Sequence, residues 1–304
     1  MKKRLTAILL ALVLMMGLTT FAAAEEGIPT AATFDELVAA MGNGATTVEI
    51  TNTIVVDTDK VLGYDDSTIS LTRSANFMGD VLLWVENATL KNLNIDGCAI
   101  ETEKRAVWIF GDSQFENVIF SNCLAGAVEV RTGTATFSNC AFKDNNSDTG
   151  AHVLNNATAV FSNCTFSGGT AEKSAGAVRN NADLTLTDCT FTGNSTNGVS
   201  TFQNGGAIYN TGTLYAENCG FIGNTSLVGG AIDSIGSSNM QLIACTLTNN
   251  SAKVGGGVSN SGTATIADTL IYKNIAIEEG TDLDSSVSIS VSYSDSYIFD
   301  ETPS

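Results

Sequence analysis

The chain has 304 residues, of which 43% are hydrophobic and only 15% are charged, so it is neither a disordered acidic segment nor a typical helical bundle. Its 32 acidic residues against 14 basic ones give a net charge of −18, which makes nucleic acid and anionic lipid poor partners. The length suits one large domain or two modest ones.

The N-terminus has the features of a secretory signal peptide. Lys2, Lys3 and Arg4 precede an apolar run that is too short for a stable membrane span, and the small residues Ala22–Ala24 follow as a cleavage site. Removal of residues 1–24 leaves 11 basic and 32 acidic residues, a formal charge of −21. We therefore expect a secreted or cell-surface protein that has no membrane span after cleavage.

Residues 25–46 are expected to form an N-terminal cap. Thr33 and Glu36 have the spacing of a capping box, and Gly42 follows as a stop signal. Between them, apolar residues recur at helical spacing: Phe34, Leu37, Val38 and Met41. The pattern predicts a short amphipathic helix that covers the first turn of the fold.

Residues 47–275 are expected to form the body of the fold. Its first strands, expected at 47–56, 67–71 and 81–85, are less regular, and a sequence repeat follows them. Four segments are copies of one another: Phe137–Phe142, Phe161–Phe166, Leu186–Phe191 and Ala216–Phe221. Weaker copies lie on either side of these four. When all the copies are aligned, equivalent positions form a column of residues at intervals of 22 to 30 residues: Leu93, Val118, Cys140, Cys164, Cys189, Cys219, Cys245 and Thr269. A second column precedes it in most turns: Val107, Val128, Val153, Val178, Ile208, Ile232 and Val258.

A unit of about 25 residues that contains only short strands cannot bury its apolar side alone, so it must stack on its neighbours. Parallel pairing of each strand with its counterpart one turn later gives a solenoid that rises roughly 4.8 Å per turn. Parallel crossovers in one sheet are almost always right-handed. The repeat lacks the leucine pattern of leucine-rich repeats. We therefore predict an all-β chain folded as a single right-handed parallel β-helix with a short N-terminal capping helix.

Residues 276–304 are expected to close the C-terminal end. Four apolar residues alternate with serines or polar residues there, which predicts a last strand with one apolar face: Val287, Ile289, Val291 and Tyr293. Residues 300–304 are expected to form a frayed tail.

Two tetrapeptides alternate through the repeat. Gly-Gly-Ala-Ile occurs at Gly205–Ile208 and Gly229–Ile232, and Phe-x-x-Asn occurs at Phe142–Asn145, Phe191–Asn194 and Phe221–Asn224. This alternation resembles the repeats of polymorphic outer-membrane protein passengers and, more broadly, right-handed parallel β-helix proteins of the pectin-lyase-like class. The resemblance covers roughly residues 90–275. It implies a secreted or surface-exposed rod, adhesive in several relatives. Because we find no outer-membrane barrel, sorting motif or lipidation cysteine in the sequence, we expect that any surface attachment is non-covalent or that the protein is released.

Five cysteines occupy one column of the repeat: Cys140, Cys164, Cys189, Cys219 and Cys245. Earlier turns place Leu93 and Val118 in the same slot, and zinc sites need closer pairs than these spacings give. We predict a buried structural ladder of thiols and no metal site; a disulfide between adjacent turns is the alternative. Cys98 and Cys123 lie at a different bend and are the candidate disulfide.

Asparagine forms another column, completed by Asp188 and Asp268: Asn92, Asn117, Asn139, Asn163 and Asn218. Because asparagine tolerates the left-handed conformation of a tight bend, we interpret this column as structural. Later turns place further asparagines three residues after the Phe, in the slot of Cys98 and Cys123: Asn145, Asn194, Asn224, Asn250 and Asn274.

Enzyme chemistry on this fold would use outward residues of one sheet. The outward column that follows the Val/Ile column is mixed: Glu129, Leu154, Arg179, Tyr209, Asp233 and Ser259. It contains no close pair of carboxylates and no cluster of acidic ligands beside a base, so we predict a solvated face without catalytic residues. Arg179, Tyr209 and Asp233 are its candidate ligand-binding residues.

The remaining candidates are weaker. His152 is the only histidine and stands where other turns have Ala177, Ala207 and Ala231, so we expect it to be exposed. No cofactor is predicted, and calcium at 57–59 or 282–284 rests only on pairs of aspartates two residues apart.

One interval of the repeat is long, which predicts an insertion at Ser195–Asn204. Val199 and Phe202 within it are candidate ligand contacts, and a loop tucked against the solenoid is the alternative. Taken together, the sequence predicts a non-catalytic scaffold for adhesion or ligand binding, with an extracellular or cell-surface glycan or protein as partner. The alternative is a carbohydrate-active enzyme, a polysaccharide lyase or glycoside hydrolase, on the same fold.

Overall fold

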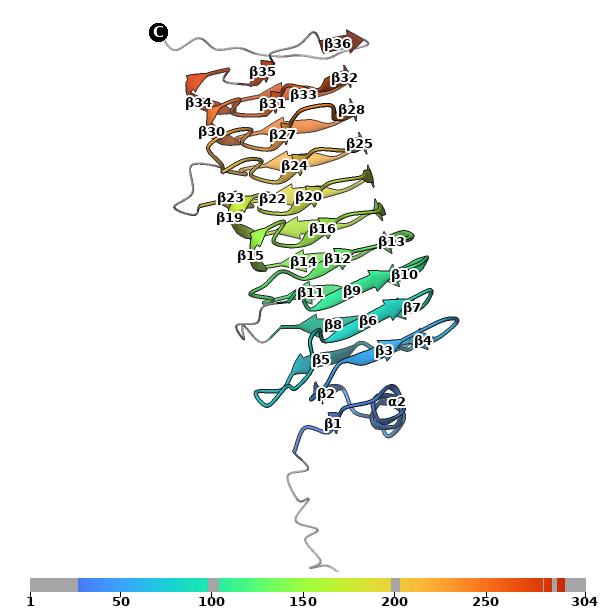
Figure 1. The fold of residues 1–304 in the computed structure, drawn as a ribbon. Helices are drawn as coiled ribbons and strands as arrows, with labels where there is room; N and C mark the ends of the chain where they lie inside the picture. The colour runs from blue at the N-terminus through green and yellow to red at the C-terminus, as the bar shows by residue number, and fades with distance from the viewer. Residues whose placement is uncertain (1–26, 98–103, 198–202, 281, 286–288, 293–304) are drawn as a thin grey trace, which may run out of the picture.

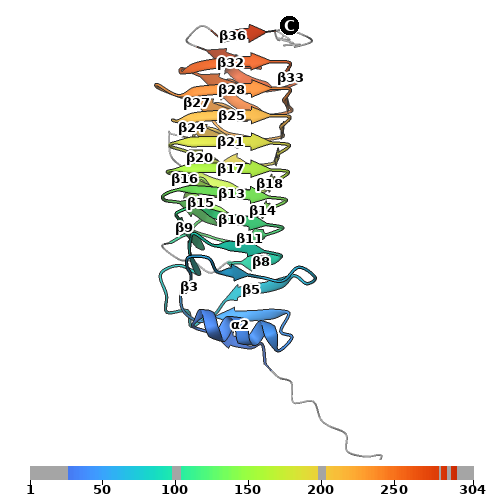
Figure 2. The same ribbon diagram turned by 90° about the vertical axis from the view of Figure 1, so that its right-hand side faces the viewer.

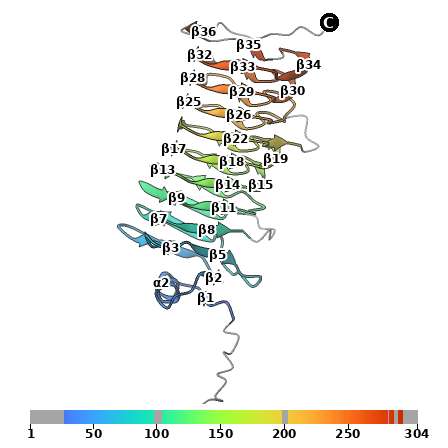
Figure 3. The same ribbon diagram turned by 180° about the vertical axis from the view of Figure 1, so that it is seen from behind.

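A computed structural model describes residues 27–97, 104–197, 203–280, 282–285 and 289–292. This part of the chain winds as a parallel β-helix with a helix at its N-terminal end (Figure 1). The predicted fold class is therefore confirmed. Each turn contributes one short strand to each of three long sheets, which run the length of the solenoid (Figures 1, 2 and 3).

Sheet A faces the viewer in Figure 3. Its eleven strands, in order, are β1 (Thr30–Ala31), β2 (Thr47–Ile50), β5 (Ile69–Arg73), β8 (Leu93–Asp96), β11 (Ile119–Ser121), β14 (Ala141–Lys143), β18 (Thr165–Ser167), β22 (Thr190–Thr192), β26 (Gly220–Ile222), β29 (Thr246–Thr248) and β33 (Leu270–Tyr272).

Sheet B faces the viewer in Figure 1. Its ten strands are β3 (Ile54–Val56), β6 (Leu83–Glu86), β9 (Val107–Phe110), β12 (Val128–Val130), β16 (Val153–Asn155), β20 (Val178–Asn180), β24 (Ile208–Asn210), β27 (Ile232–Ser234), β31 (Val258–Asn260) and β35 (Leu283–Ser285).

Sheet C faces the viewer in Figure 2. Its ten strands are β4 (Val61–Leu62), β7 (Thr89–Lys91), β10 (Ser113–Glu116), β13 (Thr134–Ser138), β17 (Thr158–Ser162), β21 (Asp183–Thr187), β25 (Thr213–Glu217), β28 (Asn239–Ile243), β32 (Thr263–Ala267) and β36 (Ile289–Ser292).

Two smaller sheets lie in the connections from sheet A to sheet B. Their strands are β15 (Asn146–Thr149), β19 (Thr170–Ser174) and β23 (Ser195–Thr196) in one, and β30 (Ser251–Val254) and β34 (Ile275–Glu279) in the other.

Stacked identical side chains fill the interior. Strands pair in parallel with their counterparts one turn away, so equal residues meet: Phe142, for example, pairs with Phe166 across β14 and β18. The rings of Phe142 and Phe166 are parallel within 4°, with centroids 4.8 Å apart, and Phe166 stacks on Phe191 at 4.4 Å. These phenylalanines are fully buried. The period seen in the sequence is thus the repeat of one continuous apolar core.

The N-terminal helix α2 (Phe34–Gly42) covers the first turn, as predicted, and contacts β1, β2 and β3. The Thr33 hydroxyl accepts a hydrogen bond from the Glu36 backbone N–H at 3.3 Å, and the Glu36 carboxylate accepts one from Ala32 N–H at 2.7 Å. Leu37 and Met41 are buried against the solenoid. Val38, which the apolar spacing grouped with them, is 39% exposed.

Asparagine and aspartate shape the bends between sheets C and A. The column residues have φ between 50° and 55°, in the left-handed region: Asn92, Asn117, Asn139, Asn163, Asp188, Asn218 and Asp268. Their side chains also link successive turns, since Asn117 Nδ2 donates to Asn92 Oδ1 at 3.1 Å. At the C-terminal end, β36 pairs with β32, while Val287 and Tyr293 lie outside the described residues.

Candidate ligand-binding face on sheet B

The outward column predicted from the sequence lies in register on the outer face of sheet B. Glu129, Leu154, Arg179, Tyr209, Asp233 and Ser259 follow one another on adjacent strands, and the column continues through Trp108 and Trp84 at one end and Asp284 at the other. No described element lies in front of this face in Figure 1.

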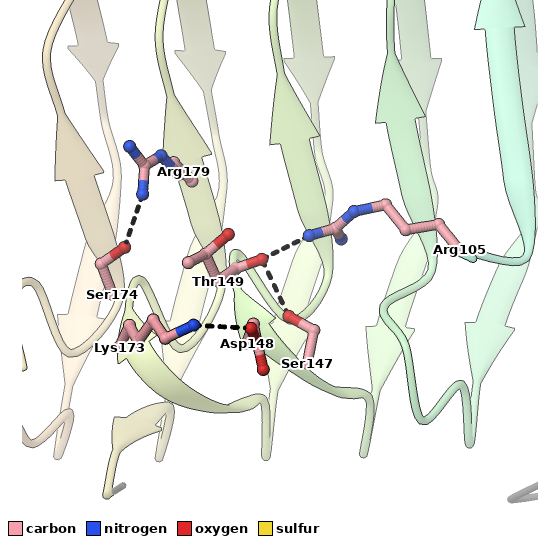
Figure 4. A network of polar contacts seen from close by, with 7 residues as sticks. All are labelled: Arg105, Ser147, Asp148, Thr149, Lys173, Ser174 and Arg179. Atoms are coloured by element: carbon pink, nitrogen blue, oxygen red, sulfur yellow. Dashed lines mark hydrogen bonds and ion pairs between the residues drawn. The ribbon is translucent and has the colours of Figure 1, made fainter. Parts of the chain in front are cut away.

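Arg179 is held in place by three neighbours. Its Nη1 donates to Ser174 Oγ at 3.1 Å (Figure 4). Its Nε donates to Asn181 Oδ1 at 3.2 Å, and its guanidinium lies 5.3 Å from the centroid of the Tyr209 ring. Arg179 and Tyr209 are both half-buried, and burial raises the pKa of Tyr209. The two residues therefore form a fixed pair on the open face.

Arg105 and Lys173, close to this pair, serve the connecting strands. The buried Arg105 guanidinium donates to the backbone oxygens of Gly150, at 2.6 Å, and Thr149 (Figure 4). Burial lowers its pKa to about 10. Lys173 pairs with Asp148 at 2.7 Å across the two strands β19 and β15. Both cations thus satisfy partners within the solenoid.

Asp233 does not lie on a solvated face, contrary to prediction, because it is only 1% exposed. Asn204 Nδ2 donates to its Oδ2 at 2.8 Å, and burial raises its pKa to about 6. Two other carboxylates lie in the column: Glu129 is four strand spacings away, roughly 19 Å, and Asp284 is two spacings away, roughly 10 Å. Glycosidase pairs lie about 5 to 9.5 Å apart, so Asp233 and Glu129 cannot act as such a pair, and the spacing to Asp284 is at the upper limit of this range.

The insertion is shorter than predicted. Ser195 and Thr196 pair with Thr170 and Ala171, so they belong to the repeat. At the other end, Asn204 bridges to Ser174 and Val228. The residues without counterparts in the preceding turn therefore lie between 197 and 203; Val199 and Phe202 are among them and lie outside the described residues. Asn204, at the C-terminal end of this segment, hydrogen-bonds to Asp233. The insertion and the outward column, which the sequence left as separate candidates, are therefore in contact through Asn204.

An aromatic cluster at the N-terminal end of the same face escaped the sequence analysis. The Trp84 and Phe110 rings stack with centroids 4.4 Å apart, and Trp108 meets Trp84 edge-on at 6.0 Å. The Arg131 guanidinium lies 3.9 Å over the Trp108 ring, and its Nε pairs with Glu129 at 3.1 Å. The available signal was that both tryptophans of the chain fall in the outward column.

Hydrogen bonds join the cluster to the Arg179–Tyr209 pair. Glu129 Oε1 accepts from Asn156 Nδ2 at 3.3 Å, and Asn156 Oδ1 accepts from Asn181 Nδ2 at 2.8 Å. Asn181 in turn binds Arg179. We call this linked set the side-chain row: Trp84, Phe110, Trp108, Arg131, Glu129, Asn156, Asn181, Arg179 and Tyr209.

His152 is fully buried, so the expectation that it is exposed was wrong. The reason is a gap in the column of buried asparagines. Asn145 and Asn194 occupy this column two turns apart, and the turn between them has Gly169 at the same position. Asn145 Nδ2 donates to His152 Nδ1 at 2.9 Å, and His152 Nε2 donates to Asn194 Oδ1 at 3.1 Å. The imidazole therefore replaces the missing amide, and burial lowers its pKa to about 3.

The same column ends on an aspartate. Asn194 Nδ2 donates to Asn224, Asn224 to Asn250 and Asn250 to Asn274, with distances between 2.8 and 3.0 Å. Asn274 Nδ2 then donates to Asp282 Oδ1 at 2.7 Å. Asp282 is buried and stands in the same position of its turn as His152.

The cysteine column lies inside the solenoid. Cys140, Cys164, Cys189, Cys219 and Cys245 are 1 to 2% exposed and are free thiols. Each Sγ donates to the backbone oxygen two residues earlier, as Cys189 does to Thr187 at 3.3 Å. Burial raises the pKa of Cys123 to about 12. Cys98 lies outside the described residues, so its pairing with Cys123 stays a prediction.

Asp57 pairs with Lys60 at 2.6 Å. Among the described residues, no group of three or more His, Cys, Asp or Glu side chains is placed to hold a metal ion. The helix found there is not long and apolar enough to cross a membrane.

Comparison with known proteins agrees with this architecture. The family described as "Right handed beta helix region" matches residues 105–276, which is more than half of the chain. No curated protein and no solved structure matches the chain. The more specific resemblance to polymorphic outer-membrane protein passengers is not confirmed by the family match. With the parallel solenoid described above, the match shows that the chain belongs to the right-handed β-helix family.

Proposed function

We propose that the protein is a secreted or surface-associated, non-catalytic scaffold that binds an extracellular glycan on the outer face of sheet B. The side-chain row carries this proposal. It offers aromatic rings, amides and guanidinium groups in one line, already fixed by their mutual contacts. Groups fixed before binding lose little conformational entropy when a ligand arrives. The signal peptide predicted at residues 1–24 supports an extracellular location.

Charge favours a neutral ligand. The chain carries a net charge of −18, which repels polyanions at low salt. On the row itself, Arg131 is paired with Glu129, and Arg179 is bound by Ser174 and Asn181. Neutral sugars present both hydroxyl groups for amides and carboxylates and apolar ring faces for aromatic side chains.

A carbohydrate-active enzyme remains the second candidate because of one observation. Asp233, next to Tyr209 on the face, has its pKa raised to about 6 by burial, and raised carboxyl pKa values occur in general acids. Against this candidate, the carboxyl is buried and bound to Asn204. Glu129, roughly 19 Å away, is also too distant to be its partner carboxylate.

The test is a binding screen of the mature protein against neutral and acidic glycans, followed by calorimetry on any glycan it retains. The proposal predicts binding that weakens in Arg179→Ala and is unchanged in Tyr215→Ala. Tyr215 is a matched control, because it lies on β25 of sheet C, where its hydroxyl donates to Glu217. If no glycan binds, or if both variants bind equally well, the proposal is wrong.

A further inference from the structure

The aromatic cluster at the N-terminal end of the side-chain row has no role in the core. Trp84, Trp108 and Phe110 lie on β6 and β9, at outward positions of sheet B, and are half-buried. The residues that alternate with them, such as Val107 and Ile109, are the buried ones. Leaving aromatic surface in contact with water is unfavourable, and grouped exposed aromatic residues often mark a contact site.

Two features indicate a ligand that is both apolar and hydrogen-bonding. The Trp108 Nε1–H is buried and has no hydrogen-bond partner in the described part of the chain. An acceptor on a ligand that reached this N–H would remove the cost of leaving it without a partner. Glu129 follows Trp108 in the column and is bound by Asn156, and the two carry carboxylate and amide groups that hydrogen-bond with hydroxyls.

The shape of the face favours a glycan over a protein as the partner. The cluster continues into a straight row of polar side chains on successive turns, roughly 4.8 Å apart along the axis. A stable protein interface would instead centre on an apolar patch that is ringed by polar residues on all sides. A linear ligand with repeating ring faces and hydroxyls fits the row better.

We infer that Trp84, Trp108, Phe110 and Arg131 form a stacking platform for the sugar rings of a neutral, linear glycan. The inference rests on the proposed function and adds the place and chemistry of contact. Because Arg131 is already paired with Glu129, the platform is close to neutral, and uronate-containing chains gain no free cation there. The glycan chain then runs along the solenoid axis from the platform toward Arg179.

The chain itself supplies a specific probe, since its only two tryptophans are both in the platform. Titration with neutral β-linked oligosaccharides, such as cello-, xylo- and chito-oligosaccharides, should therefore change tryptophan emission with the same midpoint as calorimetry. Trp108→Ala should weaken binding about tenfold or more, as loss of a central aromatic contact does. Tyr215→Ala should leave the affinity unchanged, and thermal melting will show that both variants are folded.

The outcomes separate the two proposals. Binding by calorimetry that leaves tryptophan emission unchanged, or that is equal in Trp84→Ala, Trp108→Ala and wild type, overturns the platform while the glycan-binding function stands. Binding only to oligogalacturonate overturns the neutral specificity. Failure of the wild type to bind any glycan, or platform-dependent binding of a purified protein partner instead, overturns both.

Discussion

Replacing His152 by leucine tests whether the imidazole stands in for an asparagine of the buried column. Leucine keeps most of the volume and loses both hydrogen bonds, those with Asn145 at 2.9 Å and Asn194 at 3.1 Å. Each lost hydrogen bond leaves a buried polar group without that partner, which costs about 1 to 3 kcal/mol of stability. We expect the free energy of unfolding to fall by about 2 to 5 kcal/mol at pH 7. Asn224→Leu, at an ordinary position of the column, should cost a similar amount.

The pH dependence identifies the histidine itself. Burial lowers its pKa from 6.5 to about 3 in the folded state, with Arg105 adding to the shift, so the unfolded chain binds the proton more readily. The stabilising contribution is therefore complete above about pH 6.5 and is lost as pH falls toward 3. His152→Leu lacks this loss, so the difference between wild type and variant should shrink by about 3 kcal/mol between pH 7 and pH 4.

Urea unfolding of both proteins, followed by circular dichroism at several pH values, measures these quantities. The Asn224→Leu variant is the control, because its difference from wild type should not follow the titration of His152. If His152→Leu is as stable as wild type at pH 7, or if its deficit is the same at pH 7 and pH 4, the assignment of His152 to the buried column is wrong.

Three further predictions follow from the geometry. Gly169→Ala should destabilise the fold by about 1 to 3 kcal/mol, because the added Cβ would clash with the Gly176 carbonyl oxygen and lie 2.6 Å from His152 Nε2. Gly220→Ala is the control and should be neutral, since the atoms nearest to its added Cβ lie 3.9 Å away. Both changes are measured by urea unfolding, and equal effects would contradict the packing described. Cys189→Val should change stability by about 1 kcal/mol or less, and the cysteine column should resist thiol reagents until unfolding; rapid labelling of three or more native thiols would refute its inward position. Deleting residues 198–202 should preserve the β-sheet circular dichroism spectrum and lower the melting temperature little, because both flanking ends stay in register; loss of folding would show that the segment belongs to the core.

The sequence was sufficient for the architecture because the information is periodic. Columns with one period predict stacked turns, and the left-handed bends were predictable from asparagine chemistry alone. The register of the outward column on sheet B followed directly, since a parallel solenoid pairs equivalent residues of adjacent turns.

The position of His152 was not predictable from its own turn. In the alanine column it looks like an exposed exception, and its burial depends on Gly169 in the next turn, where an asparagine is missing. His152 departs from the alanine column and Gly169 departs from the asparagine column. The connection between the two is visible only when both columns are compared. Asp233 was misplaced for a similar reason, because Asn204, at the end of the irregular interval, covers it.

The fate of a bound glycan tests the account most directly. The mature protein is incubated with each neutral or acidic glycan that it retains, with and without calcium, and the reducing and unsaturated ends are quantified. The account predicts that neutral glycans bind and are recovered intact. Product that forms with the wild type and disappears in Arg179→Ala or Asp233→Ala would contradict a non-catalytic scaffold and assign the outer face of sheet B to an enzyme.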